Sequence, residues 1–523
     1  MTIEYEKKLL KVDQPLEEVV FQHLAEGELV IPEGKPDIAK ILDLATFAYV
    51  TGKEVVQDKV MVEGIIRYNL LYIAVGDNSS VVQAEDEMGF TLYVDIEGAK
   101  PRMIAQVSLE LEHIDWHIEN SRTLNLKAVL NIGCKVRQLL QLEVIKDFVD
   151  QEAVQALMEP IKLTASGGIG SSQTIIREDV EIPDDMPSAT SVLRKEANAR
   201  VLEKKVIDNR IIIQGEADLK ILYETDEPQD PIQLLQYQIP FAHFVEVQGA
   251  YQGMDCDARA LTQELDISMR QDVVGDTRVL AIDMILFLEG EVFEFYEGDI
   301  VVDAYSPGLK LDLKREKIKQ IYQAGKDQAQ SIIKENIEIG ENMPPVANVL
   351  YSDAKPLVTD YHISQGQVIV DGALTGLVFY KPEDEGLPVN SVQVDIPFTQ
   401  TIEIEGISED MDCTCNATVL YISHTQVSPT EIELKVTLLV QVEAEAIREK
   451  EVLLDVEVVE GDQREDSGVY IYFVQPGDSL WSVAKKYNTT ISSILKFNDL
   501  EDTDSLEAGS KLMVFKRLDF SVS

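Results

Sequence analysis

Apolar and polar residues alternate along most of the chain with a period of two. The pattern is clear in Thr401-Ile-Glu-Ile-Glu405 and in Glu431-Ile-Glu-Leu-Lys-Val436. This period is typical of β-strands with one face in a core and the other in water. Turn-forming clusters separate the runs, among them GDNSS at 76–80, TDEPQD at 225–230 and KPEDEG at 381–386. Many short strands with spaced turns predict antiparallel, sandwich or barrel-like units.

One such pattern occurs three times. The copies read VMVEGIIRYNLLY at 60–72, IIIQGEADLKILY at 211–223 and VIVDGALTGLVFY at 368–380. In each copy a glycine precedes a tyrosine by eight residues, and a proline precedes that glycine by 28 residues. The copies lie 151 and 157 residues apart. Fixed self-similarity at this spacing predicts one domain repeated three times.

A second set of anchors recurs after each copy. A phenylalanine is followed by a glycine eight residues later and by a methionine five residues after that. These residues are Phe90, Gly98 and Met103; Phe241, Gly249 and Met254; and Phe398, Gly406 and Met411. Glycines inside the strands are expected at bulges or at close approaches of the backbone. We therefore divide the chain into repeats at 1–150, 151–305 and 306–460, a linker at 461–468 and a small domain at 469–517.

Three segments depart from the β pattern. Pro36 and its counterparts, Pro187 and Pro344, are suited to the first turn of a short helix, which predicts a helix at this place in every repeat. The segment Lys314–Glu335 is rich in Lys, Gln and Ala and is predicted as a helix. The glycine- and serine-rich segment ASGGIGSS at 165–172 is predicted as a flexible loop.

The last fifty residues predict the order β-α-α-β. A strand at 470–474 leads into a turn, and Asp478 or Ser479 is placed to cap a helix. Thr490 is placed to cap a second helix that runs to Phe497, and residues 511–515 read as a closing strand. The inward positions at helical spacing are Leu480, Val483, Ala484 and Tyr487, followed by Ile491, Ile494 and Leu495.

This domain strongly resembles a LysM module. The resemblance is carried by Gly477-Asp-Ser-Leu-Trp481, together with Val474, Ala484, Ile491, Leu495, Asn498, Leu500, Gly509 and Leu512. It implies binding of N-acetylglucosamine-containing glycans, peptidoglycan especially, in a shallow groove between two loops. The implied binding residues are Gly477, Asp478, Ser479, Leu480, Asn498, Leu500, Leu506 and Glu507. Trp481 is expected to belong to the core and to anchor the first helix.

The second groove loop departs from the family pattern. It carries Glu501, Asp502, Asp504 and Glu507, and Ala508 stands where a proline is usual. Four carboxylates disfavour an anionic glycan and favour a protein with a basic face. Sugar and protein thus remain alternative ligands of this groove.

The three repeats resemble the SPOCS domains of endospore-forming bacteria, on the proline, glycine and phenylalanine anchors given above. SPOCS repeats followed by one LysM module are similar to the SipL-like family of spore-coat morphogenetic proteins, and similar in plan to stage VI sporulation protein D. The resemblance implies a mother-cell protein at the forespore surface. It also implies that the protein binds the coat ATPase, stage IV sporulation protein A, with the help of its LysM module and attaches the coat to the forespore.

The amino-acid composition argues against several kinds of partner and of cellular location. The 523 residues include 46 Lys and Arg against 93 Asp and Glu, a net charge of −47, which disfavours nucleic acid and anionic membrane surfaces. The charged N-terminus and the lack of long apolar runs predict neither secretion nor membrane insertion. Four cysteines in so long a chain indicate a reducing compartment, and we expect a cytoplasmic protein.

Candidate chemical sites are weak. Cys413 and Cys415 lie two apart, but no histidine motif completes a zinc set, so buried core cysteines are expected. His113 and His117 lack the glutamate of a zinc-protease helix, so a structural or surface role is expected. The glycines at 165–172 lack the lysine of a phosphate-binding loop.

A cell-wall hydrolase is a third functional class, because LysM modules often accompany such enzymes. Such an enzyme needs a positioned nucleophile or metal beside a base. The chain has six histidines, none at a repeat-equivalent position. We therefore expect no catalytic residues, no metal and no cofactor, and a non-enzymatic scaffold with the LysM module as its specific contact.

Overall fold

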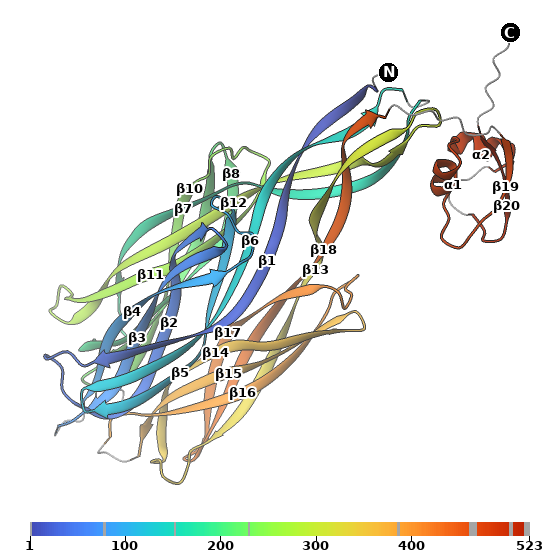
Figure 1. Cartoon of the computed structure of the whole chain (residues 1–523). Coiled ribbons are helices and arrows are strands. Elements are labelled where there is room, and N and C mark those ends of the chain that lie inside the picture. Colours follow the sequence, from blue (N-terminus) through green and yellow to red (C-terminus); the bar gives the residue numbers. More distant parts are fainter. Residues whose placement is uncertain are drawn as a thin grey trace.

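The computed structural model describes residues 3–76, 80–150, 153–227, 231–383, 387–459, 468–500 and 506–516. About three quarters of these residues lie in β-strands, and two short helices lie near the C-terminus (Figure 1). The mostly β fold with three repeated antiparallel domains and a small LysM-type domain is therefore confirmed.

Each repeat has six strands in the same order. Domain 1 comprises β1 (Tyr5–Val30), β2 (Ile38–Val56), β3 (Lys59–Ala74), β4 (Val81–Asp95), β5 (Ile104–Asn120) and β6 (Thr123–Phe148). Domain 2 comprises β7 (Gln155–Glu181), β8 (Ser191–Ile207), β9 (Arg210–Glu224), β10 (Ile232–Glu246), β11 (Asp255–Gln271) and β12 (Thr277–Tyr305). Domain 3 comprises β13 (Leu311–Glu338), β14 (Val346–Ser364), β15 (Gln367–Pro382), β16 (Asn390–Glu403), β17 (Asp412–Ser428) and β18 (Glu431–Val458).

The six strands of a domain form two three-stranded antiparallel sheets. In domain 1 the sheet orders are β1-β6-β5 and β2-β3-β4, and the other domains repeat them. Alternate residues of the central strands point between the sheets, as Leu124, Leu126, Ala128 and Leu130 do on β6. Strand β2 contacts β5 and β1 contacts β4, so the edges of the two sheets meet on both sides. The period of two thus produces a closed sandwich around one core.

The glycine and phenylalanine anchors of each repeat lie against each other in the structure. Gly64 pairs with Phe90 across β3 and β4, and a Cβ added at Gly64 would lie 2.3 Å from the Phe90 ring and 2.8 Å from the carbonyl oxygen of Tyr49. Gly215 and Gly372 have the same relation to the rings of Phe241 and Phe398. The predicted close approach at these glycines is therefore confirmed.

The tyrosine and proline of the repeat are joined by a hydrogen bond. The hydroxyl group of Tyr72 donates to the carbonyl oxygen of Pro36 at 2.8 Å. In the other repeats Tyr223 donates to Pro187 and Tyr380 to Pro344, both at 3.1 Å. All three rings are fully buried, so this bond closes the loop between the first two strands onto the core.

The three domains form a closed ring. Strand β4 contacts β8, β10 contacts β14 and β16 contacts β2, so each domain meets the next and the third meets the first. An apolar cluster shared by the domains takes residues from equivalent positions of the three repeats. They are Leu42, Leu193 and Leu350; Leu71, Leu222 and Phe379; and Val81, Ile232 and Val389. The chain therefore has the architecture of a cyclic trimer, with its three members on one polypeptide.

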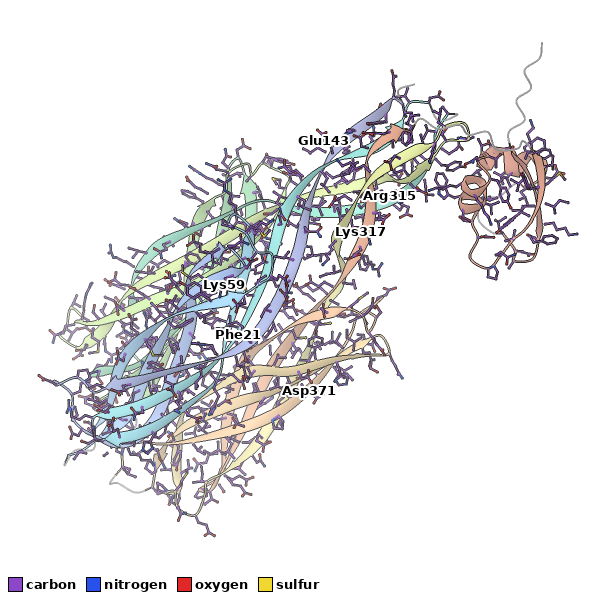
Figure 2. The ribbon with its side chains drawn as sticks, viewed as in Figure 1. Phe21, Lys59, Glu143, Arg315, Lys317 and Asp371 are labelled. Carbon is purple, nitrogen blue, oxygen red and sulfur yellow. The ribbon has the colours of Figure 1, made fainter. Side chains whose placement is uncertain are left out.

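The first and last strands of every domain continue beyond the sandwich and meet in a stalk (Figure 1). Its core again uses equivalent residues, including Leu10, Ile161 and Ile318, and Val144, Ile300 and Val452. Nearer the tip the core contains Phe148, Ala304 and Val456. Figure 2 shows Glu143, Arg315 and Lys317 on the stalk and Phe21, Lys59 and Asp371 on the sandwich domains.

The predicted helix after Pro36 is wrong. A turn in which the Lys35 N–H donates to the carbonyl oxygen of Pro32 precedes Pro36, and β2 begins at Ile38. The same turn occurs at Met186 and Met343 in the other repeats. Pairing with β3, and the bond from Tyr72 to Pro36, hold this segment extended.

The predicted helix at Lys314–Glu335 is also wrong, because the segment lies in β13, which pairs with β18 along its whole length. A long ladder of backbone bonds with β18 outweighs the local helix propensity of its Lys, Gln and Ala residues. The predicted loop at 165–172 is part of β7. A Cβ at Gly170 would lie 2.0 Å from the carbonyl oxygen of Glu246, so glycine lets β7 pass close to β10.

Candidate functional site

The C-terminal domain has the predicted order β-α-α-β. It comprises β19 (Gly468–Phe473), α1 (Leu480–Lys486), α2 (Ile491–Phe497) and β20 (Lys511–Lys516). Ser479 caps α1 in a capping box with Ser482, and Thr490 caps α2 through the Ser493 N–H. The core contains Val474, Leu480, Val483, Ala484, Ile494, Leu512 and Val514. The predicted caps and helical positions are therefore confirmed.

The first predicted groove loop is closely tied to the fold. Gly477 is exposed and has a φ of +89°, a conformation that favours glycine. The carboxylate of Asp478 accepts hydrogen bonds from the Tyr472 hydroxyl at 2.6 Å and from the Gln475 N–H at 2.7 Å. These bonds lower the pKa of Asp478 and raise that of Tyr472 to about 12. Ser479 is used as the cap and Leu480 is buried, so the side chains of Asp478, Ser479 and Leu480 all serve the fold of the domain.

Part of the second predicted groove loop also serves the fold of the domain. The amide group of Asn498 donates to the carbonyl oxygens of Ile494 and Met513 and accepts from the Met513 N–H, which ties α2 to β20. Leu500 and Glu507 are exposed, and Leu506 packs partly on the domain core. Glu501, Asp502 and Asp504, on which the acidic character of this loop depends, lie outside the described residues.

An exposed apolar face on the sheet of β19 and β20 was not predicted. Val469, Ile471 and Phe473 alternate along β19 and pair with Phe515, Met513 and Lys511 of β20 on the same face. Ile471 is 68% exposed, and Val469, Phe473, Met513 and Phe497 are also exposed. The sequence signal for this face is the unbroken apolar run VYIYFV at 469–474. A two-stranded sheet packs on the helices with one side only, so apolar residues on its other side stay exposed. We call Val469, Ile471, Phe473, Phe497 and Met513 the apolar face.

Trp481 does not lie wholly in the core. It is half-buried, packs partly on the domain core and points toward the stalk. Its indole N–H donates to the carboxylate of Asp303 at 2.9 Å, and its ring meets that of Tyr305 edge to face at 4.9 Å between centroids.

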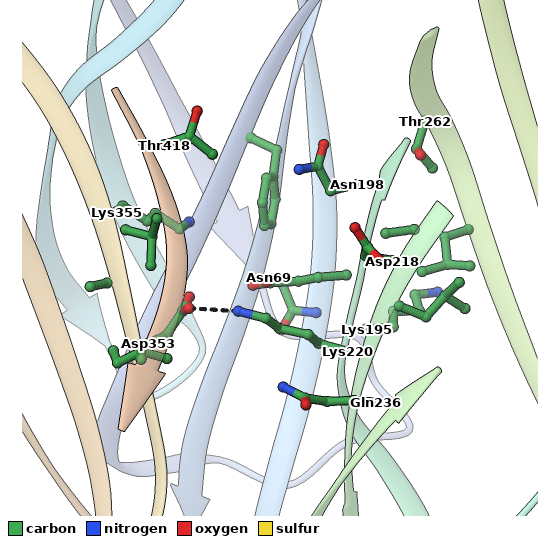
Figure 3. A pocket seen from close by; sticks show the side chains of 18 of the residues that line it. Asn69, Lys195, Asn198, Asp218, Lys220, Gln236, Thr262, Asp353, Lys355 and Thr418 are labelled. Atoms are coloured by element: carbon green, nitrogen blue, oxygen red, sulfur yellow. Dashed lines mark hydrogen bonds and ion pairs between the residues drawn. The ribbon is translucent and has the colours of Figure 1, made fainter. Parts of the chain in front are cut away.

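A cavity of about 1600 Å³ lies among the three sandwich domains (Figure 3). A lysine contact crosses each boundary there: Lys195 is 3.3 Å from Glu85, Lys220 is 3.0 Å from Asp353, and the Lys355 ammonium lies 4.4 Å from the centre of the Phe47 ring. These three lysines therefore join neighbouring domains.

Other candidate groups from the sequence lie in ordinary surroundings. Cys413 and Cys415 are half-buried against the core of domain 3, and burial raises the pKa of both thiols. His113 and His117 are exposed near the end of β5, and His113 lies 2.8 Å from Asp115. Among the described residues, no group of three or more His, Cys, Asp or Glu is arranged to hold a metal ion.

The two helices of the described part of the chain have seven residues each, and no described helix is long and apolar enough to cross a membrane.

Comparison with protein families identifies four regions. Residues 37–119, 188–270 and 345–427 match the SipL SPOCS domain, and residues 472–515 match the LysM domain. SPOCS and LysM domains are non-catalytic binding domains, associated with sporulation and with peptidoglycan binding respectively. Searches of curated proteins and of solved structures gave no match.

Proposed function

Because the chain has the SipL architecture of three SPOCS domains followed by a LysM domain, we propose that it is a non-enzymatic scaffold of the spore coat. In this proposal it acts in the mother cell, binds the coat ATPase (stage IV sporulation protein A) and helps to attach the coat to the forespore surface. The LysM domain provides the specific contact, and the ring of SPOCS domains provides a rigid body that carries it.

The apolar face of the LysM domain is the observation that favours a protein as the ligand of this domain. Exposed apolar residues scattered singly are normal, but contiguous ones mark interaction sites. Val469, Ile471 and Phe473 form such a row beside Met513 of β20. The rings of Phe497 and Phe515 continue the row, with centroids 4.0 Å apart. A sugar is held by polar groups in a groove, whereas this exposed sheet face is apolar and suits a protein surface.

A glycan ligand is the second candidate, supported by the LysM match itself. The ligand would be peptidoglycan or a lipid-linked precursor with N-acetylglucosamine units. It would lie between the loop at Gly477, Asp478, Ser479 and Leu480 and the loop with Asn498, Leu500, Leu506 and Glu507. Gly477 and Ser479 of the first loop are exposed, whereas the N–H groups of Asp478 and Ser479 already donate to the Gln475 carbonyl oxygen and to the Ser482 hydroxyl, so the glycan would meet this loop chiefly at Gly477. The side chain of Asn498, which holds two elements together, would act through the shape of the groove.

A titration of the full chain against two ligands separates the candidates. The purified coat ATPase is one ligand and a chitin or muropeptide oligomer is the other. The test variant is Ile471→Asp, on the apolar face, and the matched control is Ile175→Asp, an isoleucine on β7 that is 57% exposed. We expect Ile471→Asp to weaken ATPase binding by roughly 30-fold or more, as at a central interface position, and the control to bind like the wild type.

Each result has one meaning. Unchanged ATPase binding by Ile471→Asp would show that the apolar face is not the contact. Sugar binding without ATPase binding by the wild-type chain would establish the glycan candidate, and the coat contact would then have to be sought on the SPOCS domains.

A further inference from the structure

The LysM domain is joined to the stalk through one half-buried carboxylate. Asp303, near the end of β12, accepts a hydrogen bond from the indole of Trp481 at 2.9 Å and lies 2.6 Å from the ammonium group of Lys485. Arg315 of β13 reaches the same carboxylate from the stalk side. Trp481 and Lys485 are four residues apart on α1, so they project from one face of that helix.

An apolar contact accompanies this polar one. Tyr305 belongs to β12 but is only 6% exposed, and it is buried in the same cluster as Val474, Leu480 and Val483 of the LysM domain. Its hydroxyl group donates to the carbonyl oxygen of Thr489 at 2.8 Å. Burial raises the pKa of this phenol above its ordinary range. A side chain of the stalk thus completes the core of the LysM domain.

Only one of three equivalent places offers this contact. Phe148, Ala304 and Val456 occupy the same position in the stalk core, and each of their N–H groups donates to the preceding aspartate. The residues that follow differ: Val149 is 65% exposed, residue 305 is a tyrosine, and Glu457 is exposed. All three repeats therefore carry the aspartate, but only the second also carries the aromatic ring.

We propose that Asp303 and Tyr305 form a docking site that holds the LysM domain on the stalk tip in one fixed orientation. The docked orientation covers the face of α1 that carries Trp481 and Lys485. It leaves the first groove loop and the apolar face exposed, with β19 and β20 on the side away from the stalk (Figure 1). If the proposed ATPase contact holds, this arrangement presents that contact as a rigid end of the scaffold.

Because the LysM domain is tethered to the stalk, a weak contact is enough to keep it docked. Val459 at the end of domain 3 and Gly468 at the start of β19 are close in sequence, so the LysM domain is always near the tip. A short tether gives an effective concentration of about a millimolar. A contact with a dissociation constant well below that value stays closed, and the contact here combines a charge-assisted bond with a buried aromatic ring.

Tryptophan fluorescence tests the docking without any partner. The chain has two tryptophans, and Trp116 is 45% exposed on β5, so Trp116→Phe leaves Trp481 as the single reporter. In that background we expect Trp481 to be shielded from acrylamide and to tumble with the whole protein. Asp303→Ala and Tyr305→Ala should each shift its emission to longer wavelength, raise the quenching constant and shorten the rotational correlation time.

The matched control is Asp147→Ala, at the equivalent position of domain 1, which should leave all three quantities unchanged. Circular dichroism of each variant shows whether the strands are retained. The proposal is overturned if Trp481 of the Trp116→Phe protein already tumbles independently, or if both stalk variants with retained strands match it. Because no ATPase or glycan is present, failure of the docking and failure of the proposed function are seen separately.

Discussion

The guanidinium group of Arg194 lies 2.8 Å from the carboxylate of Asp43, the residue at the same position of the preceding repeat. Tyr351 occupies the same position in the third repeat, and its ring lies 5.8 Å from the guanidinium carbon of Arg194. Arg194 also reaches Glu196 and Asp353, and its side chain is almost fully buried. Equivalent positions that would repel or clash in three identical copies have diverged here into a complementary set.

Replacing Arg194 by methionine should strongly destabilise the ring. Burial raises the pKa of Asp43 despite the charges of Arg194 and Lys355. Burial would raise the pKa of Glu196 too, but there the same two charges hold the pKa below its ordinary value. Without the guanidinium, buried carboxylates lose their partner. Breaking a buried charge pair in this way costs about 3–5 kcal/mol, which a urea unfolding curve would show.

The control for Arg194→Met is Arg200→Met on the same strand. Arg200 is half-exposed and pairs with Glu216 and Asp218. Surface pairs contribute about 0–1 kcal/mol. Equal losses in the two variants would contradict the central role of Arg194.

Substitution of Gly64 by alanine should destabilise domain 1. The new Cβ would lie 2.3 Å from the Phe90 ring and 2.8 Å from the carbonyl oxygen of Tyr49, so ring and strand must both move. Overpacking of this kind costs about 1–3 kcal/mol. Gly89→Ala, on the neighbouring strand, meets no atom within 4 Å and should be nearly neutral. Differential scanning fluorimetry of the two variants would show whether the predicted order holds.

Loss of the Tyr223 hydroxyl should weaken the attachment of the loop before β8. Tyr223→Phe leaves the ring in place and removes the bond to the Pro187 carbonyl oxygen. The expected cost is about 1 kcal/mol. Hydrogen exchange at residues 183–190 should rise in this variant and stay at the wild-type rate in Tyr251→Phe, whose ring is exposed. No change in either variant would mean that burial of the ring alone holds the loop.

Docking of the LysM domain should depend on pH through Asp303. Burial would raise the pKa of Asp303, but the bonds from Lys485 and Trp481 and the charge of Arg315 outweigh it and lower the pKa below its ordinary value. A carboxyl group with a lowered pKa stabilises the docked state above the pKa of the released form and loses this effect as the pH falls. Trp481 emission in the Trp116→Phe protein should therefore shift to longer wavelength below about pH 4.

Asp303→Asn provides the comparison for this titration. Its emission should resemble the acid form of the parent and stay constant over the same range of pH. Far-ultraviolet circular dichroism must remain constant too, which separates undocking from acid unfolding. A transition shared by the parent and the Asp303→Asn variant would assign the pH effect to another group.

The sequence by itself determined the repeated unit and the small domain. Local spacing fixed both, because Gly64 and Tyr72 lie on one strand and the Ser479 and Thr490 caps act within three residues. The alternation of apolar residues likewise predicted antiparallel, sandwich or barrel-like units, since each strand buries one face, and the two facing sheets of each domain decided for the sandwich.

Only the tertiary structure decided how these units combine. Lys314–Glu335 became a strand because β18 offered it a full ladder of backbone bonds. The ring brings together Asp43, Arg194 and Tyr351, and the docking site brings together Asp303, Tyr305 and Trp481. Most pairs of these residues are more than 100 positions apart in the sequence. Long-range contacts of this kind follow from how the sheets close and pack, which no local spacing encodes.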